Sequence, residues 1–422
     1  MAESQSINRL GATQLRRIFD PERVARLIQI VGPHLVGGRR CVLHIMPLAW
    51  RIGHIAMEPH ALWELYGESH DRMVLLFPDS RVAPHSLGMR AVIDPYFRIQ
   101  ETDEPGIMIM GHVDAGILEQ QNLTWFQRGP SGLLDNYIKR LIETGARPRH
   151  FEVPPQVRDA ARDFCASRGM TDSDRLVVLN VRDRNFLADQ EMHFYRTADI
   201  STYVPAIRHL LDKGYWVMRL GVDGSVPGPI DDPRYVEVWR EPDYTTLLDP
   251  GLIARACFGI TCSSGPEAVF RVLGIPQIIV NCILQCEMWT NPGDRLLFKS
   301  YRTVEDGKPA RLTAMLEGGV ALHADAEAVK QCGFVVEDNS AAEILASVEE
   351  MDALVGVAET ATPSCDAGRF LEIGREYQLF LDETGHPRDA RSLTAALTQF
   401  AYALPWTRLS VANQSANPDF LE

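Results

Sequence analysis

The stretch Ile260–Asn281 reads ITCSSGPEAVFRVLGIPQIIVN, and its pattern changes twice within 22 residues. A short apolar run ends at Ser263–Gly265, a helical pattern follows, and a second apolar run begins after Gly274–Pro276. Nearly continuous apolar runs of this length are typical of strands buried on both faces of a parallel sheet. The stretch therefore predicts a strand, a helix and a second, parallel strand.

The same alternation of apolar runs and helical patterns extends over most of the chain. Strands are expected at Cys41–Leu48, Arg72–Pro78 and Gly106–Gly111, and again at Arg175–Asp183, Tyr215–Gly221, Tyr235–Glu241, Cys257–Ser263 and Pro276–Asn281. Helical stretches between strands imply a doubly wound α/β fold.

A Pro-rich segment, Gly145–Gln156, interrupts this alternation and is interpreted as a linker. The 422 residues suit two domains rather than one core. We expect an N-terminal domain at 1–155, a C-terminal domain at 156–330 and a helical extension at 331–422. The last residues, Val411–Glu422, are expected to fray.

The composition is that of a globular protein, with 45% hydrophobic and 23% charged residues. The net charge is −14, and no cluster of Lys and Arg exceeds the two arginines after Gly38, which argues against a nucleic-acid partner. No apolar run is long enough for an integral membrane segment, and the N-terminus lacks the features of a signal peptide. A cytoplasmic location is expected, and the oligomeric state stays open.

No pattern predicts a bound metal or cofactor. The eight cysteines lack the spacing of a zinc site, and nucleotide-binding and metalloprotease motifs are absent from the sequence. The acidic triplet Asp172–Asp174 precedes a strand, where it is interpreted as a turn or a helix cap rather than a metal site.

Ser263, Ser264 and Gly265 stand where a strand passes into a helix. Ligands of open α/β sheets bind beyond the carboxyl ends of the strands, and a helix N-terminus there favours an anion such as phosphate. Ser is also a common N-cap residue and Gly a common turn residue, so a purely structural role is equally compatible with the pattern.

Arg182 and Arg219 stand near the ends of two further strands, and Asp183 follows the first of them. Arginines at the same edge of a sheet are suited to holding a diphosphate without a metal ion. The alternative is a pair of ion pairs, for which Asp183 is an obvious partner.

Gly53 and His54 follow the first strand, and Glu58 comes one helical turn later. Gly53 permits a tight turn, and a histidine at the edge of a cleft is suited to general-base catalysis near neutral pH. Glu58 would orient His54 or act as the base itself. A lone histidine is more often structural, and that alternative stays open.

Three segments together resemble a bacterial family of glycosyltransferases encoded with surface-polysaccharide genes. They are LNVRDRNF (179–186), the block from Phe194 to Gly221, and the opening stretch; RIGHIAMEP (51–59) is similar to that family's first loop. The resemblance covers roughly residues 40–300. It implies a GT-B fold, in which two Rossmann-like domains face each other across a cleft, and chemistry that needs no bound metal.

The resemblance implies transfer of a sugar from a nucleotide-sugar donor to a glycan or other hydroxyl acceptor, as in surface polysaccharide synthesis. The C-terminal domain would bind the donor and the N-terminal domain the acceptor. Glu267 lacks the second glutamate of the donor pair found in some retaining GT-B enzymes, which leaves the stereochemistry open. The alternatives are a nucleotide-sugar epimerase and a catalytically silent scaffold that binds sugar nucleotides. The implied catalytic residues are His54 and Glu58, and the substrate-binding residues are Gly53, Arg182, Asp183, Arg219, Ser263, Ser264, Gly265 and Glu267.

Overall fold

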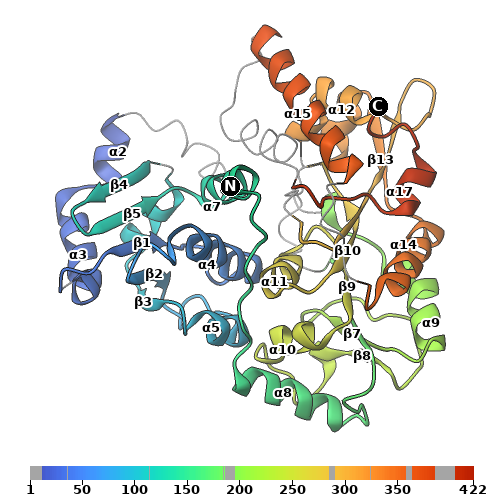
Figure 1. The fold of residues 1–422 in the computed structure, drawn as a ribbon, viewed down its shortest axis with the longest axis horizontal. Helices are drawn as coiled ribbons and strands as arrows, with labels where there is room; N and C mark the ends of the chain where they lie inside the picture. Colours follow the sequence, from blue (N-terminus) through green and yellow to red (C-terminus); the bar gives the residue numbers. More distant parts are fainter. Residues whose placement is uncertain are drawn as a thin grey trace. The chain divides into compact units, whose positions relative to one another are not determined.

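The computed structural model describes residues 12–35, 37–113, 115–183, 185, 195–284, 290–323, 325–357, 364–384 and 404–422. The chain forms two compact units, Met1–Val157 and Arg158–Glu422 (Figure 1). Each unit contains its own, largely parallel main sheet, and no strand pairing joins the two sheets within the described residues. The division falls inside helix α8 (Pro155–Ala166).

Unit 1 alternates strands and helices, as its sequence pattern indicates. Its described elements are α2 (Ala12–Ile18), α3 (Pro21–Leu35), β1 (Cys41–Ile45), α4 (Ile52–Tyr66), β2 (Arg72–Pro78), α5 (Leu87–Ile93), β3 (Arg98–Thr102), α6 (Pro105–Met108), the 3-10 helix η2 (Ile109–His112), β4 (Gly116–Gln120), β5 (Leu123–Gln127) and α7 (Pro130–Thr144).

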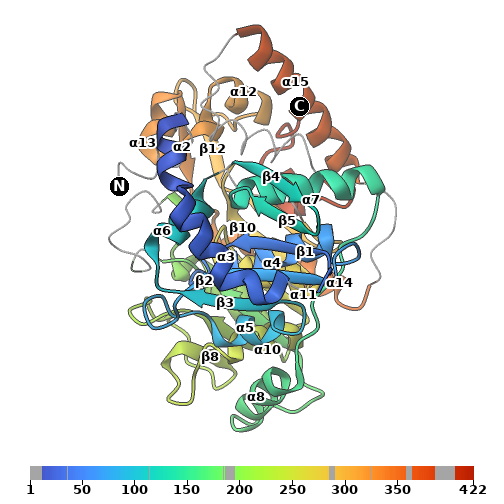
Figure 2. The same ribbon diagram turned by 90° about the vertical axis from the view of Figure 1, so that its left-hand side faces the viewer.

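The sheet of unit 1 has the strand order β3-β2-β1-β5-β4. Strands β3, β2, β1 and β5 are parallel, whereas β4 pairs with β5 as an antiparallel hairpin at one edge (Figure 2). The chain leaves β1 toward β2 on one side and returns as β5 on the other. The carboxyl ends of β1 and β5 therefore form a topological switch point, where open α/β sheets usually bind ligands.

Alternate residues of β1 face opposite sides of this sheet. Leu43 and Ile45 pack into the apolar cluster under α3 and α6, whereas His44 contacts α4 on the other side. A strand places successive side chains on opposite faces, so a polar residue in the middle of an apolar run is directed to one specific neighbour. For His44 that neighbour is the helix that follows its own strand.

The prediction of a strand at Gly106–Gly111 is wrong. This segment forms α6 and η2, and Pro105 occupies the first turn of α6, where its missing N–H has no helical partner to lose. A short apolar run does not distinguish a buried strand from a buried helical turn.

The linker between the units is attached to unit 1. Phe151 stacks on Trp63 of α4 with ring centroids 5.2 Å apart, and it also contacts Tyr96 at 4.8 Å. Arg149 lies 4.2 Å above the Trp63 ring and forms an ion pair with Glu64 at 2.5 Å. The Pro-rich sequence is therefore an extended strap on α4 rather than a loose tether.

Unit 2 continues the alternation after α8. Its described elements are β6 (Leu176–Asn180), η4 (Ile200–Tyr203), α9 (Val204–Asp212), β7 (Trp216–Leu220), β8 (Tyr235–Glu237), η5 (Val238–Arg240), α10 (Leu248–Arg255), β9 (Phe258–Thr261), α11 (Gly265–Leu273), β10 (Gln277–Cys282), β11 (Arg295–Phe298), β12 (Ser300–Thr303), α12 (Leu312–Glu317), η6 (Val320–Leu322), α13 (Ala326–Gln331), β13 (Phe334–Glu337), α14 (Ala341–Leu354), α15 (Cys365–Thr384) and α17 (Val411–Ala416).

The main sheet of unit 2 has the strand order β11-β10-β9-β6-β7-β8, and all its pairings are parallel. Counted from its first strand, this is the 3-2-1-4-5-6 order of a Rossmann fold. The switch point lies between β6 and β9, which carry Arg182 and Ser263 just beyond their carboxyl ends. The expected α/β class with Rossmann-like sheets is thus confirmed, while the cleft expected between the domains stays a prediction.

Helices cover both faces of the unit 2 sheet. Figure 1 shows α9 and α14 on one face and α10 and α11 on the other. A Cβ at Gly259 of β9 would lie 2.3 Å from the ring of Phe270 in α11. This glycine lets α11 pack directly on the sheet, and the close packing fixes the direction of the helix that starts at Gly265.

Two expectations for residues 331–422 are wrong. Strand β13 pairs antiparallel with β12, so the segment is not purely helical. The C-terminal residues do not fray, because α17 packs against α14 and β11 and Phe420 is buried. Phe420 also contacts Phe298 of β11, with ring centroids 5.1 Å apart. Burial of this aromatic side chain holds the end of the chain in unit 2.

Asn281, near the end of β10, has a left-handed backbone with φ of 52° and is fully buried. Its N–H donates to Oδ1 of Asn339 at 2.6 Å, and the N–H of Asn339 donates to Oδ1 of Asn281 at 2.7 Å. The Asn281 amide also donates to Tyr203 at 3.2 Å. These bonds join β10, η4 and the start of α14.

We predict that Asn281→Ala destabilises unit 2 by about 2–4 kcal/mol. It leaves the buried N–H of Asn339 without its acceptor and places Ala in a left-handed conformation. Asn281→Gly loses the same bond without that backbone strain and should be less destabilised. Urea unfolding measures the stability of both Asn281 variants. Gln121→Ala is the control, because Gln121 also has a left-handed backbone, with φ of 51°, but is exposed. Equal stability of N281A and wild type would contradict this role.

Candidate functional site

A buried carboxylate connects two histidines in unit 1. Oε2 of Glu58 lies 2.9 Å from Nε2 of His44, and Oε1 lies 2.7 Å from Nδ1 of His54. His44 comes from β1, whereas His54 and Glu58 lie one turn apart on α4. The predicted interaction between His54 and Glu58 is present, and sequence analysis missed His44.

Glu58 is ionised in this environment. Its burial alone would raise the pKa, but hydrogen bonds from His44 and His54 outweigh that effect and lower the pKa to about 2. The side chain is 1% exposed, so water contributes almost nothing to the stability of the charge. The two imidazoles therefore hold the carboxylate in its charged form.

His54 occupies the first turn of α4, and its side chain is 22% exposed. Because Nδ1 is bonded to the carboxylate, the proton lies on Nδ1 and the lone pair on Nε2. Among the residues that the structure describes, none forms a hydrogen bond with Nε2 of His54. A solvent-accessible imidazole oriented by a carboxylate can accept a proton from a bound hydroxyl group.

Gly53 does not form the tight turn expected from the sequence. It is the second residue of α4, and the turn lies before it at Arg51, whose backbone is extended. Because glycine has no side chain, the position before His54 in the first turn of α4 carries none. Contact of Gly53 with a substrate stays a prediction.

Arg182 and the Ser263–Gly265 turn come together in unit 2. The N–H of Arg182 lies 3.4 Å from Sγ of Cys262, which directly precedes Ser263. Burial raises the pKa of the Cys262 thiol to about 11, whereas the charges of Arg182 and Arg196 act in the opposite direction. The charge of Glu267 acts on the same thiol and raises its pKa, so this loop is influenced by a carboxylate as well as by two arginines. Sequence analysis missed Arg196, which lies within the block that carries the family resemblance.

Helix α11 starts at Gly265 without a side-chain cap. Ser264 is its N-cap residue and has an extended backbone, but its hydroxyl group forms no capping hydrogen bond. The alternative in which Ser264 serves as an ordinary N-cap is therefore not realised. Glu267 lies 3.5 Å from Arg271 one turn further along the helix, so its described partner is intramolecular.

Arg219 differs from expectation, because it does not project above the edge of the sheet. Its side chain is fully buried in β7, donates to Glu237 at 3.0 Å and lies 3.6 Å from Asp183. It also donates to the carbonyl of Val226 at 2.7 Å. The ion-pair alternative describes this geometry, with buried rather than surface partners. Contact of Arg219 with a ligand stays a prediction.

Asp183 holds the loop after β7 in place. Its Oδ2 accepts from the N–H of Val226 at 3.0 Å, and its Oδ1 accepts from the N–H of Asn185 at 3.0 Å. With Arg219 alongside, Asp183 links the loops that follow two neighbouring strands. It therefore shapes the switch point even without touching a ligand.

The acidic triplet at 172–174 forms a turn, as expected. Asp174 accepts from the backbone N–H of Thr171 at 2.7 Å, and this bond lowers the pKa of the carboxyl group. Within the described ranges, no group of His, Cys, Asp and Glu has a geometry that could hold a metal ion. None of the helices in those ranges has both the length and the apolar character needed to cross a bilayer.

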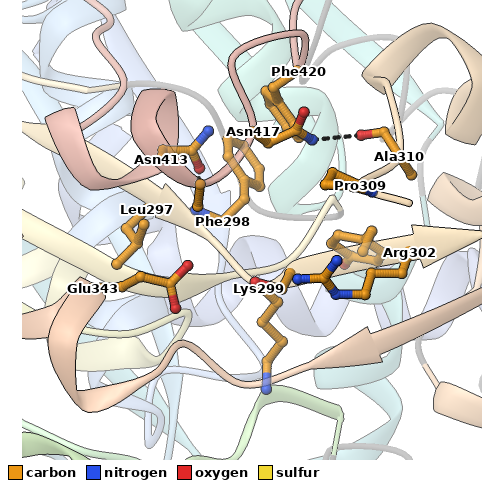
Figure 3. A pocket seen from close by; sticks show the side chains of 13 residues that line it. Leu297, Phe298, Lys299, Arg302, Pro309, Ala310, Glu343, Asn413, Asn417 and Phe420 are labelled. Atoms are coloured by element: carbon orange, nitrogen blue, oxygen red, sulfur yellow. Dashed lines mark hydrogen bonds between the residues drawn. The ribbon is translucent and has the colours of Figure 1, made fainter. Parts of the chain in front are cut away.

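A separate pocket lies in unit 2 beside β11 and β12 (Figure 3). Its polar side chains are already bonded within the protein: Lys299 contacts Asp338, Asn413 accepts from the N–H of Phe298, and Asn417 donates to Ala310. Glu343 belongs to the capping box at the start of α14. We therefore assign the pocket no chemistry.

No family model and no curated protein sequence matches the chain. Three solved structures resemble it at 13% identity. They are a glycosyl transferase family 9 protein from Veillonella parvula (57% of this chain and 80% of that chain, TM-score 0.37), the ADP-heptose lps heptosyltransferase II of E. coli (61% and 89%, 0.37), and the dodecameric iron-containing heptosyltransferase TibC in complex with ADP-D-beta-D-heptose (61% and 63%, 0.31). A likeness of this size assigns neither a family nor a function.

We predict that ionised Glu58 stabilises the folded protein at neutral pH and that this contribution is lost in acid. Because its folded-state pKa is lowered from 4.5 to about 2, its contribution is complete above pH 4.5 and disappears as the pH falls toward 2. The loss is on the order of 3 kcal/mol. Unfolding measured against pH should show this slope in wild type and lack it in Glu58→Gln. The control Glu119→Gln, at an exposed position on β4, should retain the slope.

We further predict that Arg219→Ala destabilises unit 2 by about 3–5 kcal/mol, since it leaves two buried carboxylates without their cation. Arg240 provides the matched control. It contacts the same Glu237 at 3.0 Å but is 58% exposed, so Arg240→Ala should cost no more than about 1 kcal/mol. Denaturant titration distinguishes the two, and an R219A protein as stable as R240A would show that the buried pairing contributes little.

Proposed function

We propose that the protein is a glycosyltransferase that moves a sugar from a nucleotide-sugar donor to a hydroxyl acceptor. The observation that carries the proposal is the imidazole of His54, which is oriented by Glu58 at the carboxyl edge of the unit 1 sheet. A general base in this position would take the proton from the acceptor hydroxyl as its oxygen attacks the anomeric carbon. The acceptor would thus bind to unit 1.

The donor would bind to unit 2. Its Rossmann strand order has a switch point between β6 and β9, beside the uncapped N-terminus of α11. Backbone N–H groups at that terminus and the charges of Arg182 and Arg196 would stabilise the diphosphate as it leaves. Ser263, Ser264 and Gly265 belong to this proposed site, and Asp183 supports its loop. Such a leaving-group site works without a metal ion.

The proposed setting is the cytoplasmic synthesis of a surface glycan or polysaccharide in a bacterium. It rests on the resemblance of three segments, Leu179–Phe186, Phe194–Gly221 and Ile260–Asn281. The identity of the sugar and the nucleobase follows from none of these residues. A thermal-shift screen of nucleotide-sugars would find the donor, because a bound ligand raises the unfolding temperature by mass action.

Two variants should separate chemistry from binding. His54→Ala should lower the single-turnover rate by about 10²–10⁴-fold and leave donor affinity unchanged. Arg182→Ala should weaken donor binding by roughly ten- to a hundred-fold, as expected for loss of one charge-assisted contact. Calorimetry measures the binding, and quenched-flow mass spectrometry measures the product.

His70→Ala is the control, since this half-buried histidine bonds to Thr124 and lies outside the proposed site. Conversion of the donor without an acceptor would indicate an epimerase instead, and donor binding without any product would indicate a scaffold. Full turnover in His54→Ala with the true acceptor would exclude His54 as the base.

A further inference from the structure

We propose that His44 is a buried imidazolium cation that forms a permanent ion pair with Glu58 and thereby positions His54. The protonation of His44 is independent of the reaction. Only its effect on catalysis rests on the proposed function.

Both ring nitrogens of His44 face an oxygen atom of the protein. Nδ1 lies 3.1 Å from the carbonyl oxygen of Phe126, and Nε2 lies 2.9 Å from Oε2 of Glu58. A backbone carbonyl oxygen can only accept a hydrogen bond, so Nδ1 carries a proton. A neutral ring would then direct the lone pair of Nε2 at the carboxylate, which is also an acceptor.

One proton therefore lies between Nε2 of His44 and Oε2 of Glu58. It could reside on either atom, giving an imidazolium with a carboxylate or a neutral ring with a carboxylic acid. An ordinary imidazole holds a proton more strongly than an ordinary carboxylic acid does. Oε1 of Glu58 also accepts from His54, which further favours the ionised carboxylate. The proton is accordingly assigned to His44.

Burial favours this pairing of opposite charges. The side chains of His44 and Glu58 are 2% and 1% exposed, so either charge alone would be strongly destabilised. Together they are neutral, and the hydrogen bonds to Phe126 and His54 satisfy the remaining donor and acceptor positions. Removal of either partner would leave an uncompensated charge in the core of unit 1.

The pair has two opposing effects on His54. Glu58 fixes the proton on Nδ1 of His54 and so directs the Nε2 lone pair away from the helix. Because His44 already donates to the same carboxylate, Glu58 stabilises a positive charge on His54 less strongly. When His54 accepts a proton at Nε2, Glu58 must stabilise two imidazolium ions. His44 thus keeps His54 neutral, and able to act as a base, at lower pH.

Other charges near α4 have partners of their own. On α7, Lys139 pairs with Asp135 at 2.8 Å, and Arg140 donates to the carbonyl of Glu64. On α5, Arg90 pairs with Asp94 and with Glu101 of β3. Arg72 of β2 donates to the carbonyl of His34 in α3 and lies on the same face of the strand as Val74 and Leu76, away from α4. The titratable groups that act on Glu58 are His44 and His54.

Nitrogen-15 NMR of the full-length protein, labelled in histidine, tests the protonation directly. Two protonated ring nitrogens are expected for His44 from about pH 6 to pH 9, across the range in which an ordinary histidine loses its charge. His44 is identified by its contact with the Phe126 ring, whose centroid lies 5.8 Å away, and His54 by the loss of its signals in His54→Gln. An unprotonated Nε2 on His44 in this range would overturn the proposal, whether or not the protein transfers sugars.

The pH profile of single-turnover rate tests the effect on His54. His44→Gln retains a donor for Glu58 but removes the cation, so the acidic limb of the profile should move to higher pH by about one unit. A purely structural role for His44 would lower stability without moving the limb, and that result would overturn the positioning role. His70→Gln, the matched control, should leave the limb in place. If His44→Gln does not fold, the spectrum of the wild-type protein decides.

Discussion

The carboxylate of Glu58 is stable in the core of unit 1 only because two imidazoles donate to it from different directions. One donor comes from the sheet and the other from the helix that follows, and the bond from His44 joins α4 to β1. A shift of the helix by one residue would break the bond between Glu58 and His44. The geometry of the proposed base is thus a consequence of a folding constraint and is already complete before a substrate binds.

Unit 2 also contains a buried charge that is compensated by oppositely charged partners, but here the central group is a cation. Arg219 is a cation buried in a strand, and Asp183 and Glu237 surround it from the neighbouring loop and strand. Asp183 in turn holds the backbone of Val226. Both units therefore place a compensated charge just below the edge where their sheets would bind ligands. In unit 2 the compensating carboxylate of Asp183 also holds the loops after β6 and β7, whereas in unit 1 Glu58 orients His54 on α4.

Sequence patterns predicted most strands of unit 2, because parallel strands buried on both faces give nearly continuous apolar runs. They failed where the run was short, as at Gly106–Gly111, since periodicity cannot separate a strand from a helical turn. The pairing of His54 with Glu58 was accessible because helical spacing relates the two residues. His44 was missed because its partner depends on tertiary structure, although a histidine inside an apolar strand signals a specific contact. The same reasoning applies to Arg219, whose burial no local pattern reveals.

The strap formed by the linker has a mechanical consequence. Phe151 is fixed by its ring contacts, and the N–H of Glu152 donates to Tyr96 at 3.1 Å. Helix α8 begins at Pro155, so only Val153 and Pro154 lie between the anchored segment and that helix. A joint this short has few free torsions, one of which is restricted by the proline ring. The strap is therefore restricted up to the start of α8, and its anchored part is built on α4, the helix that carries His54.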